Sequence, residues 1–129
     1  MRPLIKKLTA TVALMLVFTL AIAQGALDDI RSSIGSGNTG GVSRYFDNTV
    51  SMTIAGSRGT YSSSQAEMVL RGFFSKNNPK GFTTEHSGGG KQHKYVIGTL
   101  KTSCGSYRAY FSVREDGGRY VIQEIRIEK

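Results

Sequence analysis

The stretch SSSQAEMVLRGFFSKNNP, residues 62–79, predicts one amphipathic helix that packs a single face against the rest of the chain. Its apolar residues recur at intervals of three and four, which is the helical period. They are Ala66, Val69, Leu70, Phe73 and Phe74. Ser64 and Glu67 stand three residues apart at the start, which is the spacing of a capping box. Pro79 ends the pattern, because the residue before a proline avoids the helical region. We therefore expect a helix over residues 64–76.

The chain that follows alternates with a period of two, which predicts strands. We expect strands over residues 82–86, 94–100 and 106–114, then a hairpin at Asp116-Gly117-Gly118 and a last strand. One face is apolar throughout, and its members are Tyr107, Ala109, Phe111, Val113, Val121, Ile125 and Ile127. Tyr110, Tyr120 and Ile122 fall on the opposite face and form a candidate homodimer interface, because a monomer leaves them in water. A few exposed tyrosines are also ordinary on a monomer, so both states stay open.

The residues before the helix predict two short helical segments and a hairpin. Residues 26–34 have helical spacing, and a second segment carries Val42, Tyr45 and Phe46. Residues 49–54 alternate as a strand, with a turn at 55–59 and a return strand at 60–62. This order indicates an α+β fold, in which helices cover the concave face of a curved antiparallel sheet.

Such a cone-shaped core commonly keeps an open mouth, which is a natural pocket. We expect aromatic side chains to line it, namely Tyr45, Phe46, Phe73, Phe74, Tyr95 and Phe111. Core packing alone also explains Phe73 and Phe74, because aromatics on a helical stripe need no ligand.

Residues 1–23 have the three parts of a cleaved signal peptide. Arg2, Lys6 and Lys7 precede an apolar run from Leu8 to Ala23, which ends in a small-residue A-x-A site. An uncleaved membrane anchor is the alternative, but the run is short for a span of roughly 20 residues. We therefore expect residues 24–129 to form one secreted or periplasmic domain without a stable membrane anchor.

Charge and cysteine content narrow the classes of partner. The chain has 17 Lys and Arg against 9 Asp and Glu, a formal charge of +8. These charges stand singly rather than in runs, which favours a solvated surface and predicts no nucleic-acid partner. Cys104 is the single cysteine, so no internal disulfide is expected. It is either a small residue near a strand end or half of an intermolecular disulfide.

Six stretches in a fixed order carry a resemblance to a known family. They are Tyr61-Ser62, Gln65 to Leu70, Phe73 to Asn77, Glu85 to Gly88, Tyr95 to Leu100 and Gln123 to Arg126. The chain resembles the small secreted bacterial proteins of domain of unknown function 4783, in the nuclear transport factor 2-like (cystatin-like) superfamily. The resemblance implies that fold for the whole mature chain. It implies no activity, since the superfamily holds isomerases, dehydratases, immunity proteins and binding modules on one scaffold.

Two glycine-rich motifs do not indicate nucleotide binding. Residues 35–40, GSGNTG, match the dinucleotide pattern, but a predicted helix precedes them and no carboxylate follows at the required distance. Gly88-Gly89-Gly90-Lys91 lacks the first glycine and the hydroxyl of a phosphate loop, so we interpret it as a hairpin loop. His86 and His93 flank this loop beside Glu85, but two histidines alone do not make a zinc site. We expect no metal and no cofactor.

An enzyme on this scaffold needs a buried acid or base and an oxyanion donor. The acidic candidates are Asp47, Glu85 and Glu124, and the candidate donors are Tyr45, Tyr61 and Tyr95. No pair among them has a diagnostic spacing, and no nucleophile motif is present. We therefore predict a non-enzymatic binding module for a small ligand or an envelope protein. The alternatives are a small-molecule lyase or isomerase, which requires one of the three acids to point inward, and a dimeric interaction protein.

Overall fold

The computed structural model describes residues 25–129. The predicted signal peptide and its cleavage site lie outside these residues and stay predictions. Within the described part of the chain, no helix has the length and apolar character needed to cross a membrane.

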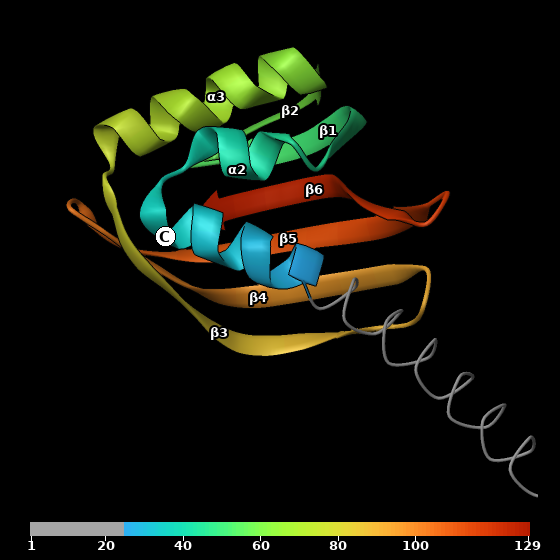
Figure 1. The fold of residues 1–129 in the computed structure, drawn as a ribbon. Helices are drawn as coiled ribbons and strands as arrows, with labels where there is room; N and C mark the ends of the chain where they lie inside the picture. The colour runs from blue at the N-terminus through green and yellow to red at the C-terminus, as the bar shows by residue number, and fades with distance from the viewer. Residues whose placement is uncertain (1–24) are drawn as a thin grey trace, which may run out of the picture.

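Three helices cover one face of a six-stranded sheet (Figure 1). The first helix spans residues 25–36. The other elements are α2 (Thr39–Ser43), β1 (Phe46–Ile54), β2 (Ser57–Ser62), α3 (Ser63–Lys76), β3 (Pro79–Gly89), β4 (His93–Thr102), β5 (Gly105–Asp116) and β6 (Arg119–Glu128). The face without helices is called the outer face below.

The strand order is β2-β1-β6-β5-β4-β3, so the last strand returns to lie beside the first. Neighbouring strands pair antiparallel, except for the parallel pair of β1 and β6. The parallel pair arises because α3 carries the chain across the sheet after β2, and β3 to β6 then run back as a meander. The predicted α+β fold with a curved sheet and helices on one side is confirmed.

The helix α3 begins one residue earlier than predicted, because a different serine caps it. The hydroxyl of Ser62 accepts a hydrogen bond from the Gln65 amide at 3.3 Å, and the Gln65 side chain accepts one from the Ser62 amide at 3.2 Å. The predicted box of Ser64 and Glu67 is therefore wrong by two residues. Glu67 instead accepts from the Arg71 guanidinium at 2.6 Å.

Two stretches that were predicted as a helical segment and a loop belong to strands. Phe46 starts β1 and is not part of a second helical segment. Gly88 and Gly89 continue β3 and pair with Tyr95 and Lys94, so the predicted hairpin loop begins too early. A Cβ at Gly88 would lie 2.7 Å from the Tyr95 hydroxyl oxygen, so glycine is needed there to let the ring lie against the backbone.

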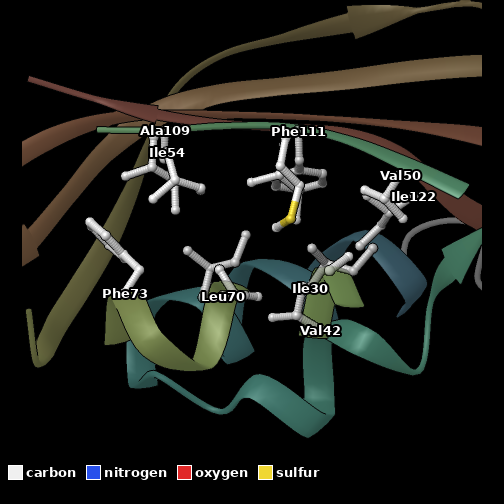
Figure 2. Close-up of a cluster of buried hydrophobic side chains, with 14 of the residues drawn as sticks. Ile30, Val42, Val50, Ile54, Leu70, Phe73, Ala109, Phe111 and Ile122 are labelled. Carbon is white, nitrogen blue, oxygen red and sulfur yellow. The ribbon is translucent and has the colours of Figure 1, made fainter. Parts of the chain in front are cut away.

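Side chains from the helices and the sheet meet directly between the two layers (Figure 2). Ile30 from the first helix, Val42 from α2 and Leu70 from α3 are fully buried beneath Phe111 and Val50 of the sheet. The predicted apolar face of β5 is confirmed, since Tyr107, Ala109, Phe111 and Val113 are all buried. The centre of the cone is thus filled with side chains.

A β-bulge in β6 overturns the predicted exposed position of Tyr120 and Ile122. Ser112 lies opposite Glu124 whereas Val113 lies opposite Ile122, so Gln123 is an extra residue. The bulge reverses the alternation, and Ile122 is 0% exposed in the core. Tyr120 also packs against the core. Val121 is buried as expected, at 6% exposed, but it lies outside the main core cluster and borders a surface hollow with Phe46 and Arg119.

Candidate functional site: an apolar groove beside α3

An open groove of about 350 Å³ separates α3 from the hairpin of β1 and β2. Most of its wall is apolar, because the inward-facing residues of β1 meet one side of α3 there. The lining residues are Met52, Ile54, Ala55, Ser57, Tyr61, Met68, Val69, Gly72, Phe73, Lys76 and Asn77.

Met68 stands at the rim of this groove with 70% of its surface exposed. In residues 25–129 it is the one large hydrophobic side chain that is exposed. A flexible thioether adapts to irregular apolar partners, and methionines are common on binding surfaces for this reason. Because Met68 is exposed beside the apolar lining of the groove, the two form one apolar surface patch.

Ala55 lines the groove from a strained turn. It has φ +50°, and Gly56 after it has φ +88°, so the two residues make a tight hairpin turn. The left-handed region costs an L-residue roughly 1–2 kcal/mol, and asparagine or glycine normally occupies this position. The two-residue hairpin loop between Ile54 and Ser57 accounts for this conformation, and it places Ala55 at the groove.

The groove becomes polar at the C-terminal end of α3, where Lys76 and Asn77 lie. The Asn77 amide is fixed, because it accepts from the Tyr107 hydroxyl at 2.9 Å and donates to the Phe73 carbonyl at 3.2 Å. A second hollow adjoins the groove at Ala55 and is lined by Ala55, Gly56, Tyr107, Glu128 and Lys129.

Of the six residues predicted to line a pocket, Phe73 alone lines this groove. Phe74 and Phe111 belong to the core, and Tyr45 and Phe46 border two other surface hollows. Tyr95 lies on the outer face, because its neighbour Val96 points into the core. The sequence interpretation therefore placed the pocket too deep. It also missed Met68, whose position outside the apolar stripe of α3 was the available signal.

The three acidic candidates lie away from the groove. The Arg114 guanidinium donates to Asp47 at 3.0 Å, and this bond, together with the Asn48 amide, lowers the pKa of the Asp47 carboxyl. Glu124 pairs with Arg126 at 2.9 Å. Glu85 is exposed and accepts a hydrogen bond from the Thr99 hydroxyl. The condition of the enzyme hypothesis, an inward-pointing acid, is not met by any of the three.

The candidate oxyanion donors are also dispersed. The Tyr45 hydroxyl donates to Asp29 at 2.7 Å, and partial burial followed by this bond raises the Tyr45 pKa. The Tyr95 hydroxyl lies 3.0 Å from His86 Nε2 on the outer face. Tyr61 alone among the three lines the groove. In residues 25–129, no three metal-ligating side chains gather at one place.

The outer face carries a row of stacked side chains that crosses four strands. Tyr95 and Tyr110 stack with ring centroids 6.3 Å apart and planes 26° apart. The Arg126 guanidinium lies 5.0 Å from the Tyr110 centroid, and His86 lies 5.7 Å from the Tyr95 ring. Tyr110 is therefore where the predicted interface placed it, but its neighbours are Tyr95 and Arg126 rather than Tyr120 and Ile122.

Known structures share this architecture. A DUF4783 family protein from Bacteroides fragilis is 31% identical to this chain. Its structure matches with a TM-score of 0.74 over 78% of this chain and 95% of that chain. One from Bacteroides ovatus is 28% identical, with a TM-score of 0.75 over 78% and 92%. An NTF2-like protein of unknown function from Cytophaga hutchinsonii is 7% identical, with a TM-score of 0.59 over 81% and 86%, and shows the fold alone. No curated protein matches the sequence.

The model of one family, described as domain of unknown function (DUF4783), matches residues 27–128. This range includes every strand, α2, α3 and all the residues of the groove. The fold is that of NTF2-like and cystatin-like proteins. The chain therefore belongs to the DUF4783 family, and its curved sheet with helices on one side is shared with the two Bacteroides structures named above.

Proposed function

We propose that this protein is a non-enzymatic binding module whose groove between α3 and the β1–β2 hairpin receives an apolar group. The observation that supports this most directly is the exposed Met68 at the rim of an apolar groove. A volume of about 350 Å³ lies at the lower end of the range in which small-molecule sites occur. Another hollow, of about 540 Å³, lies between the first helix and β3, but charged side chains such as Asp28, Arg31 and Lys80 line it.

Met68→Asp is expected to weaken binding of the neutral apolar dye Nile red at least tenfold, as measured by fluorescence titration. The substitution removes apolar contact and places a charge where the dye must displace water, and a tenfold loss corresponds to about 1.4 kcal/mol. Ser64→Asp is the matched control, because it adds the same charge to an exposed position of α3 that does not line the groove.

The control is expected to bind the dye like the wild type. Equal binding by the wild type and Met68→Asp would reject the groove as the site. A wild-type protein that does not bind the dye at all would reject the proposal. Circular dichroism of each variant checks that the fold is retained.

A second candidate function is self-association through the outer face, supported by the row of Tyr95, Tyr110 and Arg126. Two arginines of this face, Arg114 and Arg126, pair with Asp47 and Glu124, which lowers the repulsion between two copies of a basic chain that approach there. Stacking between neighbouring strands also stabilises the sheet of a single copy, so contact with a second copy would be an additional role for the same side chains.

We expect the wild type to sediment as a dimer at high protein concentration and Tyr110→Lys to sediment as a monomer. The lysine removes the stacked ring and adds a charge at the centre of the face. Ser32→Lys, at an exposed position of the first helix, adds the same charge elsewhere and should leave the dimer intact. A wild type that stays monomeric at every concentration would dispose of this second function.

A further inference from the structure

Positive charge lies at one end of the apolar groove. Lys76 lines the groove in the last turn of α3, where the negative end of the helix dipole stabilises an ammonium group. In residues 25–129, Lys76 takes part in none of the ion pairs. Its charge is therefore available to a ligand that occupies the groove.

A second lysine lies near the same end. The Lys129 ammonium is 5.3 Å from the centre of the Tyr107 ring, and that ring meets Phe73 edge-on at 5.1 Å. Lys129 lines the hollow that adjoins the groove at Ala55. The groove itself is lined by one lysine, Lys76, and by no acidic side chain, whereas the adjoining hollow is lined by both Lys129 and Glu128.

The opposite end of the groove is apolar. The whole groove runs along α3 from Met68 to Lys76, and this distance is about 12 Å at 1.5 Å per helical residue. Val69 and Phe73 line it from α3, and Met52 and Ile54 line it from β1. An elongated apolar chain can lie in this space with one end at the rim formed by Met68.

We infer that the ligand of this groove is a single-chain amphiphile with an anionic head group, whose chain lies along α3 and whose head lies at Lys76 and Lys129. The inference rests on the binding function proposed above and names the ligand class for that site. Charge complementarity carries it, because an apolar chain alone would not need lysines at its end. The head is a carboxylate or a phosphate.

Three amphiphiles with the same ten-carbon chain test the head group by displacement of Nile red below their micelle concentrations. We expect decanoate to displace the dye at a concentration at least tenfold lower than decyltrimethylammonium, with decanol between them. The preference for decanoate should fall as salt is added, because exposed lysines are screened.

Lys76→Met and Lys129→Met locate the head. We expect Lys76→Met to weaken decanoate binding about fivefold to tenfold without weakening the binding of decanol or Nile red, and we expect a smaller loss for Lys129→Met. Lys91→Met is the matched control, since Lys91 is exposed in the turn between β3 and β4 and lines neither space. It should bind decanoate like the wild type.

The outcomes separate the two proposals. If Nile red binds but the three head groups bind equally, the anionic head is rejected and the apolar groove stands. If Nile red and all three amphiphiles fail to bind, both proposals fall. A monodecanoyl glycerol phosphate serves as a fourth probe: tighter binding than decanoate assigns the head to a membrane lipid, and weaker binding assigns it to a free fatty acid. Both of these results support the inference.

Discussion

Replacing Phe111 with alanine is expected to lower the free energy of unfolding by about 3–5 kcal/mol, because the whole ring is lost from a filled core. Phe111 is 0% exposed and lies between the sheet and the helices, where the side chains of Leu70 and Ile30 also point (Figure 2). A domain of this size has a total stability of about 5–15 kcal/mol. The variant should therefore unfold at a much lower urea concentration.

Urea unfolding followed by circular dichroism measures the loss. Tyr110→Ala is the matched control, because Tyr110 immediately precedes Phe111 on β5, points to the outer face and is half-buried. We expect it to cost clearly less. A loss for Phe111→Ala no greater than that of the control would show that the interior has open space beside the ring, as the sequence interpretation had assumed for a pocket.

The helix α3 and the strands β4 and β5 could be predicted from the sequence because their periods are local. The apolar stripe that includes Leu70 and Phe73 specifies the buried face of α3 without any knowledge of its partner. The alternation from Tyr107 to Val113 does the same for β5. With the predicted element order and the resemblance, these local signals were sufficient for the fold and the family.

The capping residue and the strand ends were less predictable because several residues could satisfy the same local rule. Three consecutive serines precede α3, and the alignment with Gln65 rather than Glu67 depends on where β2 ends. Gly88 and Gly89 resemble a loop in the sequence, but the Tyr95 ring requires glycine at Gly88 within the strand.

The site could not be predicted because it lies between elements. The groove exists where α3 stands away from the β1–β2 hairpin, and no local pattern encodes that separation. Aromatic residues in the sequence pointed to a pocket inside the cone, whereas packing filled that space with Phe111 and Phe74. The exposed side chain of Met68 is the feature that marks the groove.

The bulge in β6 is the largest departure from the predicted pattern. An extra residue changes which side chains face the core, and its presence depends on pairing with β5 rather than on β6 itself. Strict alternation placed Ile122 beside Tyr110 on the outer face. The structure buries Ile122 completely, and its amide donates to the Tyr45 carbonyl at 2.6 Å.

Replacing Ile122 with aspartate is expected to cost more than about 4 kcal/mol, because it buries a carboxylate without a partner. Gln123→Asp is the matched control, since Gln123 is the adjacent, half-exposed residue of the bulge. It should cost no more than about 1 kcal/mol. Both are measured by urea unfolding at pH 7.

A milder variant keeps the test informative if Ile122→Asp does not fold. Ile122→Val should cost about 0.5–1.5 kcal/mol in a packed core and almost nothing on an outer face. Burial raises the pKa of the introduced carboxyl, so its charged form is penalised and the loss relative to the wild type should shrink as the pH falls toward about 4. If Ile122→Asp instead matched Gln123→Asp at every pH, strict alternation would be right and the bulge would be wrong. The outer face would then regain Ile122 as part of an apolar interface with Tyr110.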